Sequence, residues 1–235
     1  MDALSERLRR FEGWTVIFDL DGTLVHTAPD LTASLNHALA GHNLAPVEMR
    51  AIYPMLGQGA RKMVERGLTY HDQPFDTALV DRLTDRFIEY YAENIAHESR
   101  PFEGCVPFLD AAHAAGLKLA VCTNKIESMA SLLIRTLDLE DRFASLIGGD
   151  TLPTKKPDAA PLIAAVERAG GTMPKAVMIG DSVADIDGAK AAGLPSVAVS
   201  FGYSEVPVTE LGADAVIDNY NALAGALEAL IPSAG

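Results

Sequence analysis

The chain lacks the features that mark membrane-spanning and disulfide-stabilised proteins. It has only two cysteines in 235 residues, Cys105 and Cys122, and they do not have C-x-x-C spacing. We therefore expect both to be reduced packing residues rather than a disulfide. No stretch approaches the roughly 18 uninterrupted apolar residues of a membrane helix. Residues 1–10 are charged and lack the apolar segment of a signal peptide. These absences predict a cytoplasmic protein that does not bind a membrane.

Positive charge is also scarce. The chain has 19 Lys and Arg against 32 Asp and Glu, for a formal net charge of -13. Binding a nucleic-acid backbone needs clustered Lys and Arg, so we expect no nucleic-acid partner. We also expect the chain to be a monomer or a homodimer. No G-x-x-x-x-G-K-[ST] loop occurs, and the pair Gly57 and Gly59 lacks the preceding strand and the third glycine of a dinucleotide-binding loop. The six histidines have no metal-binding spacing and are expected on the surface or among the inserted helices described below.

Short apolar runs alternate with helical patterns over most of the chain. The expected strands are an initial run from residue 15, then residues 117–123, 145–147, 176–179, 196–200 and 215–217, and the clearest helices are 126–137 and 158–169. This alternation predicts an α/β fold, a doubly wound and mostly parallel sheet with helices on both faces. Ligands bind beyond the carboxyl ends of such strands.

The alternation is interrupted by a helical insertion. Between Val25 and Pro101 the sequence shows helical patterns and no strand, with the first helix starting at a capping-box-like Thr27 and Asp30 around Pro29. Further helices are expected at 31–40, 48–56, 60–68 and 77–96. We interpret residues 26–97 as a small all-helical cap domain, and residues 1–25 with 98–235 as the catalytic core. Extra helices packed directly on the sheet are the alternative.

The most informative segment is residues 15–24, which read Thr-Val-Ile-Phe-Asp-Leu-Asp-Gly-Thr-Leu. An apolar, β-branched run ends here in two carboxylates, Asp19 and Asp21, which are costly to bury unless chemistry or a cation accounts for them. A carboxylate at a strand end can attack phosphorus. A second one, two residues on, can protonate the leaving oxygen and later deprotonate water. For an isolated pair, an Asx turn or helix cap is the competing interpretation.

A second acidic cluster favours the functional interpretation. Asp181 and Asp185 follow the apolar residues 177–179, in the segment Gly-Asp-Ser-Val-Ala-Asp. Adjacent carboxylates repel each other and a phosphate, and a hard divalent cation relieves that repulsion. We therefore predict a Mg²⁺ site in which Asp181 supplies the remaining ligand beside Asp19 and Asp21.

Candidate phosphate-binding groups follow two other runs. Thr123 and Asn124 lie after an expected strand and just before a helix, where a hydroxyl and backbone N–H groups favour an anion. Lys156 precedes Pro157 and a helix start, and Lys155 is the competing candidate for the same role. Taken singly, Thr123 is typical of a helix cap and Lys156 of a solvated surface lysine.

These motifs together resemble the haloacid dehalogenase (HAD) superfamily of phosphatases with a helical type 1 cap, whose core is Rossmann-like. The first motif is Asp-Leu-Asp-Gly-Thr-Leu at 19–24, the second Thr123 with Asn124, the third Lys156 with Pro157, and the fourth Gly-Asp-Ser-Val-Ala-Asp-Ile at 180–186. The resemblance covers nearly the whole chain. Because dehalogenases of the superfamily lack the second Asp of the first motif, Asp21 indicates phosphoryl transfer.

The resemblance implies a role for each of these residues. Asp19 would be the nucleophile that forms an aspartyl-phosphate, and Asp21 the general acid and base. Mg²⁺ would be bound by Asp19, Asp181 and the Asp21 carbonyl, with Asp185 in or just behind the metal shell. The phosphoryl group would be held by Thr123, Asn124 and Lys156.

Within the superfamily the chain is most similar to phosphoglycolate phosphatases, through residues 28–31, 56–60 and 148–153. The implied substrate is a small phosphorylated metabolite, 2-phosphoglycolate above all, although His26 stands where relatives usually have Asp. Arg61 could pair with a substrate carboxylate, or it could be a solvated arginine at a helix start. A pyrophosphatase, a phosphosugar phosphatase, a mutase resembling β-phosphoglucomutase and a non-catalytic binding protein remain as alternatives.

Overall fold

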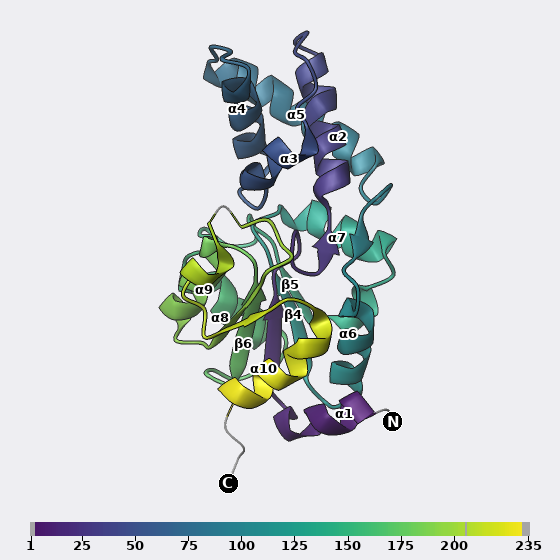
Figure 1. Cartoon of the computed structure of the whole chain (residues 1–235), viewed down its shortest axis with the longest axis vertical. Coiled ribbons are helices and arrows are strands. Elements are labelled where there is room, and N and C mark those ends of the chain that lie inside the picture. Colours follow the sequence, from purple (N-terminus) through teal and green to yellow (C-terminus); the bar gives the residue numbers. More distant parts are fainter. Residues whose placement is uncertain (1–2, 205, 232–235) are drawn as a thin grey trace.

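The computed structural model describes residues 3–204 and 206–231. It shows an α/β core with a group of helices at one end (Figure 1). The strands of the large sheet are β1 (Thr15–Phe18), β4 (Lys118–Cys122), β5 (Ser145–Ile147), β6 (Ala176–Gly180), β7 (Ser196–Val199) and β8 (Ala215–Ile217). The core helices are α1 (Ala3–Leu8), α6 (Cys105–Ala114), α7 (Glu127–Thr136), α8 (Ala159–Arg168), α9 (Val183–Ala192) and α10 (Leu223–Leu230). Short 3-10 helices occur at Arg9–Phe11, Tyr53–Met55, Glu140–Arg142, Val208–Glu210 and Tyr220–Ala222.

The six strands form one parallel sheet in the order β5-β4-β1-β6-β7-β8. β1 lies between β4 and β6, with Phe18 opposite both Val121 and Ile179. The chain therefore starts in the middle of the sheet and is wound outward in both directions. This arrangement confirms the predicted α/β fold, and every expected strand is present.

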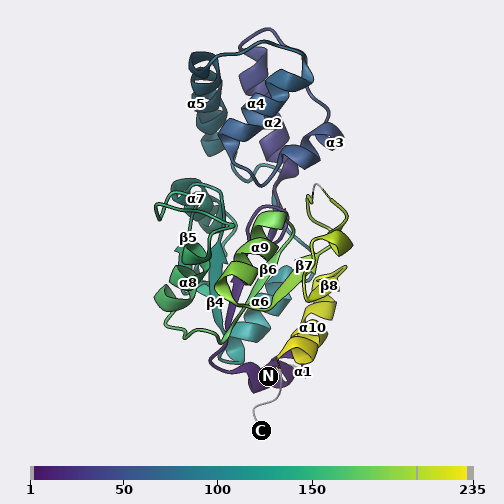
Figure 2. The ribbon, with the colours of Figure 1, turned by 90° about the vertical axis from the view of Figure 1, so that its left-hand side faces the viewer.

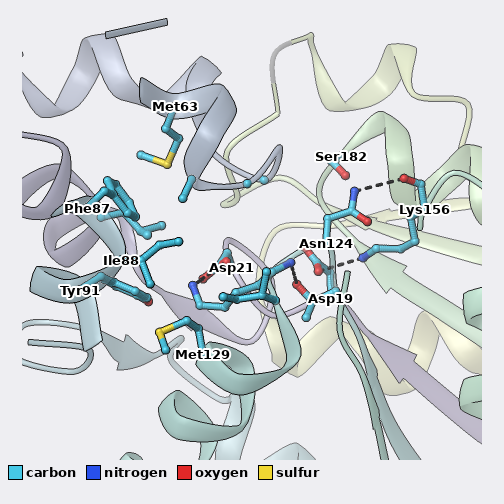
Figure 3. A pocket seen from close by; sticks show the side chains of 17 residues that line it. Asp19, Asp21, Met63, Phe87, Ile88, Tyr91, Asn124, Met129, Lys156 and Ser182 are labelled. Carbon is cyan, nitrogen blue, oxygen red and sulfur yellow. Dashed lines mark hydrogen bonds and ion pairs between the residues drawn. The ribbon is translucent and has the colours of Figure 1, made fainter. Parts of the chain in front are cut away.

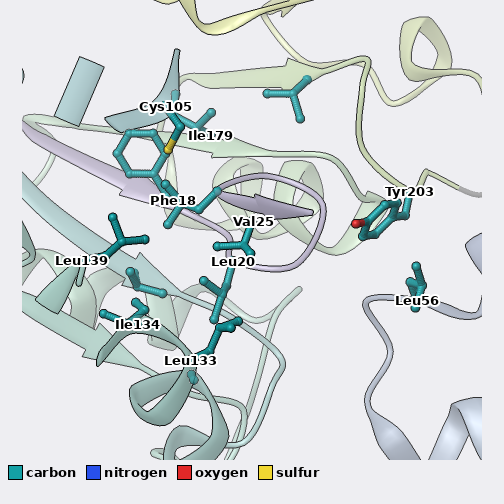
Figure 4. Packing of buried hydrophobic residues seen from close by; sticks show 14 of the residues in the cluster. Phe18, Leu20, Val25, Leu56, Cys105, Leu133, Ile134, Leu139, Ile179 and Tyr203 are labelled. Atoms are coloured by element: carbon teal, nitrogen blue, oxygen red, sulfur yellow. The ribbon is translucent and has the colours of Figure 1, made fainter. Parts of the chain in front are cut away.

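Helices cover both faces of the sheet. Along β1, Ile17 belongs to a buried cluster with residues of α8 and α9, whereas Val16 and Phe18 belong to the cluster on the opposite face, with residues of α6, α7 and α10. Figure 4 shows part of this second cluster, in which Phe18 lies close to Cys105 and Ile179. Because the central strands are covered on both faces, they read as continuous apolar runs. Both cysteines are buried and free, as predicted.

The inserted helices gather beyond one end of the sheet. They are α2 (Ala28–Ala40), α3 (Met49–Ile52), α4 (Ala60–Tyr70) and α5 (Thr77–Glu93). Figure 2 shows them as a separate layer above the core, on the side where β1 leads into the insertion. They pack mainly against one another, through apolar side chains such as Leu35, Val64 and Phe87. We refer to α2–α5 as the cap.

Two short strands lie where the chain enters and leaves the cap. β2 (Val25–His26) and β3 (Arg100–Pro101) pair in antiparallel orientation. The prediction that no strand occurs between Val25 and Pro101 was therefore wrong at both ends of the insertion. A two-residue strand has no periodicity to detect, because its pairing depends on two distant segments meeting.

The start of α2 also differs from the prediction. Thr27 is the N-cap residue but makes no side-chain capping hydrogen bond. Asp30 does not complete a capping box, because its carboxylate accepts hydrogen bonds from the backbone N–H groups of Glu98 and Ser99. His26 lies in β2, and its Nδ1 is 2.7 Å from the Tyr203 hydroxyl.

Within the described residues, no helix has the length and apolar character that crossing a membrane requires.

Candidate active site

Three of the predicted catalytic and ligand-binding residues lie at the carboxyl ends of three adjacent strands. Asp19 follows β1, Thr123 follows β4, and Asp181 follows β6. Because β1 lies between β4 and β6, these three residues lie together at one end of the sheet. In Figure 2 this is the end of the sheet next to the cap. All three are at least 95% buried. The topology thus brings together residues that are far apart in the sequence.

Lys156 lies at the centre of this group. Its Nζ is 2.9 Å from Asp19 Oδ1, 2.6 Å from Asp185 Oδ1 and 2.5 Å from the Cys122 carbonyl oxygen. An ammonium has three hydrogens to donate, so these three acceptors account for all of them. Figure 3 shows the contact between Lys156 and Asp19 on the side of the cavity away from Met63, Phe87 and Ile88. Lys156 can therefore stabilise and orient Asp19, and it presents its charge to a bound anion.

Burial is the dominant influence on the pKa of Asp19. Desolvation raises the pKa of Asp19 to about 6, in opposition to the Lys156 charge, and the nearby Asp185 charge raises it further. Desolvation also raises the pKa of Asp181 well above its usual range, with added repulsion from Asp19 and Asp185. The site therefore carries more negative charge than Lys156 alone offsets.

Three carboxylates could hold a metal ion. Asp19, Asp181 and Asp185 each offer an oxygen, and these oxygens lie within 4.8 Å of one another. Three acidic groups around one lysine leave an excess of two negative charges, which matches a divalent cation, and oxygen ligands suit Mg²⁺. The donor set therefore fits the ion that the sequence predicts. The Asp21 carboxylate lies outside this group, and the resemblance assigns only its carbonyl to the metal.

Neighbouring groups hold Asp181 and Asp185 in place. Asp181 accepts hydrogen bonds from the Thr23 hydroxyl at 2.9 Å and from the Tyr203 backbone N–H at 2.7 Å. Asp185 Oδ2 accepts from the hydroxyl and backbone N–H of Ser182, at the start of α9. One oxygen of Asp185 thus caps the helix while the other faces Lys156.

The Asp181 side chain needs a glycine beside it. Gly22 has φ of +87°, a conformation that favours glycine, and a Cβ there would lie 2.5 Å from Asp181 Oδ2. The Gly22 turn therefore allows the loop after β1 to approach the end of β6 closely. This contact is a physical reason for glycine after the two aspartates of the first motif.

Asp21 faces the cap and pairs with Lys125. Lys125 Nζ lies 3.1 and 3.0 Å from the two Asp21 carboxylate oxygens, and both side chains are more than 90% buried. The same Nζ lies 4.4 Å from the ring centre of Tyr91, on cap helix α5. Lys125 thereby contacts the candidate general acid and the cap at once.

The other predicted residues occupy distinct places. The Thr123 hydroxyl accepts a hydrogen bond from the backbone N–H of Lys125, and Asn124 Nδ2 donates to the Lys156 carbonyl at 3.2 Å. Asn124 Oδ1 is buried without a hydrogen-bond partner. Both residues line the cavity that contains Asp19 and Asp21. Lys155, the alternative to Lys156, is exposed.

Arg61 is not in this cavity. Its side chain is 48% exposed and forms ion pairs with Asp81 and Glu65 on the cap. It lines a neighbouring groove with Lys155 and Val183. In this structure its charge is already matched within the cap.

The cavity has a polar floor and an apolar roof. The core contributes the two aspartates, Thr123 and Asn124. The apolar side is formed by the cap residues Leu31, Met63, Phe87, Ile88 and Tyr91, together with Met129 of core helix α7. Figure 3 shows Met63, Phe87 and Ile88 facing Asp19 and Lys156 across this space. Such a roof excludes water and strengthens the electrostatic interactions beneath it.

The sequence reasoning missed three residues at this site. Lys125 directly follows Thr123 and Asn124, so its position after β4 was a usable signal. Thr23 belongs to the first motif and could also have been noted. Tyr91 carries no local signal, because only the packing of α5 over the core brings it to Lys125.

Comparison with known proteins shows that the chain is a phosphatase. The haloacid dehalogenase-like hydrolase model matches residues 16–199, which include the whole cap and most of the core. The chain therefore belongs to the haloacid dehalogenase-like hydrolase family.

Similar proteins agree with this assignment. The chain is 45% identical over 219 residues to a phosphoglycolate phosphatase of Agrobacterium fabrum, covering 93% of this chain and 94% of that protein. It is 46% identical over 213 residues to a phosphoglycolate phosphatase of Caulobacter vibrioides, covering 91% and 90%. A crystal structure described as a predicted phosphoglycolate phosphatase from Haemophilus somnus superposes with a TM-score of 0.85 and 27% identity, covering 93% of this chain and 99% of the other.

Proposed function

We propose that this enzyme hydrolyses 2-phosphoglycolate to glycolate and phosphate through a Mg²⁺-dependent aspartyl-phosphate mechanism. The observation that carries the proposal is Asp19, a buried carboxylate at the end of the central strand, 2.9 Å from Lys156 and within 4.8 Å of two further carboxylates. The relatives named phosphoglycolate phosphatase support the choice of substrate.

Asp19 is the proposed nucleophile. Its carboxylate oxygen attacks phosphorus, the bond between phosphorus and the ester oxygen breaks, and the phosphoryl group becomes bound to Asp19. The charge of Lys156 favours the ionised form of Asp19, which is the form that attacks phosphorus, and the ion pair holds the Asp19 carboxylate in position. Water then attacks the phosphoryl group and releases phosphate, which restores the free carboxylate.

Asp21 is the proposed general acid and base. It donates a proton to the leaving oxygen in the first step and takes a proton from the attacking water in the second. Its pairing with Lys125, which lies over Tyr91 of the cap, supports this role, because the leaving part of the substrate is proposed to lie on the cap side of Asp19. Residues 26–97 are the proposed cap, which encloses that part and excludes bulk water.

The remaining groups bind the phosphoryl oxygens. Thr123 and Asn124 are proposed to donate to these oxygens from the end of β4, and Lys156 adds positive charge. Mg²⁺, held by Asp19, Asp181 and the Asp21 carbonyl with Asp185 beside them, would offset the repulsion between carboxylates and phosphate. Cytoplasmic location and a monomeric or dimeric state are parts of the same proposal.

Phosphate release from a panel of phosphoesters tests the function. The panel contains 2-phosphoglycolate, pyrophosphate and phosphosugars, each assayed with Mg²⁺ and with EDTA, for the native chain and for Asp19→Asn. We expect the highest kcat/KM for 2-phosphoglycolate, loss of activity with EDTA, and no turnover by the folded Asp19→Asn variant. Circular dichroism of the variant confirms that the fold is retained.

Four results would contradict the proposal. Full activity of Asp19→Asn would exclude Asp19 as nucleophile. A higher kcat/KM for pyrophosphate or a phosphosugar would contradict the assignment of 2-phosphoglycolate as the substrate. Conversion of a phosphosugar to its isomer without free phosphate would indicate a mutase, and no turnover on any substrate would indicate a binding protein.

A further inference from the structure

Within the described part of the chain, two lysines supply all the positive charge that lines the active-site cavity. They are Lys125 and Lys156. Lys156 donates to three acceptors of the core and has no hydrogen left for a ligand. Lys125 donates to both carboxylate oxygens of a single partner, Asp21, which engages two of its three hydrogens, and its remaining side faces the ring of Tyr91. Lys125 is therefore the cation that can take a further anionic partner without breaking its existing ion pair.

The location of Lys125 decides which part of a substrate it meets. The phosphoryl group belongs next to Asp19, and Asp21 must be near the ester oxygen. Lys125 binds Asp21 from the cap side, so it lies beyond the ester oxygen, among the atoms of the leaving group. The surrounding lining there is apolar, through Leu31, Ile88 and Met129. A negative charge on the leaving group has no other positively charged partner among these lining residues.

From this placement we infer that Lys125 binds the carboxylate of the leaving group, and that it selects phosphoesters with an anionic group close to the ester oxygen. The inference rests on the proposed function and extends it to the residue that distinguishes the substrate. Lys125 thereby takes the carboxylate-binding role that the sequence suggested for Arg61. The exposed side chain of Arg61 is paired with Asp81 and Glu65 outside the cavity. Apolar surroundings strengthen a charge-assisted hydrogen bond of this kind.

The test compares two substrates of nearly the same shape. 2-Phosphoglycolate carries a carboxylate, and its amide, carbamoylmethyl phosphate, has a neutral group in the same place. We expect Lys125→Met to reduce the preference for the carboxylate, the ratio of the two kcat/KM values, by about 10- to 100-fold. Lys125→Arg should retain most of the preference, and Arg61→Met should leave the ratio unchanged.

A change in the ratio separates recognition from positioning. If Lys125 only orients Asp21, Lys125→Met will slow both substrates by the same factor, and the inference is wrong. Binding provides a second measurement that does not depend on turnover. In an Asp19→Asn background, calorimetry should show that Lys125→Met weakens 2-phosphoglycolate about 10-fold or more and the amide hardly at all; equal weakening would contradict the inference.

Failure of the proposed function gives a different result. If the native chain prefers another phosphoester over 2-phosphoglycolate, the substrate assignment fails whatever Lys125 does. If the native chain prefers 2-phosphoglycolate and Lys125→Met keeps that preference, only the role of Lys125 fails. A thermal melt of Lys125→Met with a cooperative transition establishes that the comparison uses folded protein.

Discussion

Asp30, at the start of the first cap helix, accepts two hydrogen bonds from Ser99, at 2.8 Å from the backbone N–H and 2.6 Å from the hydroxyl. Both residues are almost fully buried. The same carboxylate accepts from the backbone N–H of Glu98 at 3.0 Å. One side chain thus joins the segment that enters the cap to the segment that leaves it.

Removing this carboxylate should destabilise the protein. Asp30→Ala leaves the backbone N–H groups of Glu98 and Ser99 and the buried Ser99 hydroxyl without their acceptor, which costs about 2–3 kcal/mol of unfolding free energy. Ser99→Ala removes only the hydroxyl contact and should cost about 1 kcal/mol. Urea denaturation measures both values. Equal stability of Asp30→Ala and the native chain would show that the contact does not support the fold.

Magnesium should stabilise the folded enzyme through Asp181. At a concentration 100 times its Kd, a ligand adds about 2.7 kcal/mol, which corresponds to roughly 5–10 °C in Tm for a chain of this size. We expect that increase for the native chain and its loss in Asp181→Asn. Asp187→Asn is the matched control, since Asp187 lies on α9 with a side chain that is 51% exposed. A Tm increase in Asp181→Asn equal to the native increase would place the ion elsewhere.

The metal-free enzyme should become more stable as the pH falls from about 7 to 5. Burial raises the pKa of Asp19 to about 6, so the folded state takes up a proton in a range where the unfolded chain, with its ordinary pKa of 3.8, does not. The stability gained is complete below the ordinary pKa and is lost as the pH rises through about 6. Thermal melts in EDTA at a series of pH values measure this gain in stability. The Asp19→Asn variant should show a smaller gain, and an identical profile would count against the raised pKa.

Lys156 should be essential for stability and its neighbour should not. Lys156→Met leaves Asp19 and Asp185 buried beside each other without their cation, which costs about 3–5 kcal/mol. Lys155→Met changes an exposed side chain next to it and should stay within about 0.5 kcal/mol of the native chain. Denaturant melts of the two variants provide the comparison. A similar loss in both would mean that the turn, rather than the buried charge, matters.

Much of the core could be predicted because its signals are local. Each buried parallel strand is an apolar run, and the helices predicted at 126–137 and 158–169 occur as Glu127–Thr136 and Ala159–Arg168. Asp19 and Asp181 could be singled out because carboxylates directly after such runs are costly without a function.

Other features could not be predicted because they depend on distant partners. Asp30 satisfies a local capping pattern, yet its carboxylate turns to Ser99, which folding brings beside it from the other end of the cap. The sequence favours Lys156 through its place before Pro157 and through the resemblance, but leaves the adjacent Lys155 as a competing candidate. Only the path of the chain into α8 decides which of them points at Asp19.

The sequence by itself determined the alternation of strands and helices, the helical insertion after the first strand, and the acidic groups at strand ends, because each depends on neighbouring residues. The tertiary structure decided which charges meet. Placing β1 beside β4 brings Lys125 to Asp21, and the segment between β5 and α8 brings Lys156 to Asp19, each across more than 100 residues of chain. Such pairings arise from strand order and from the packing of the cap, and no local pattern encodes either.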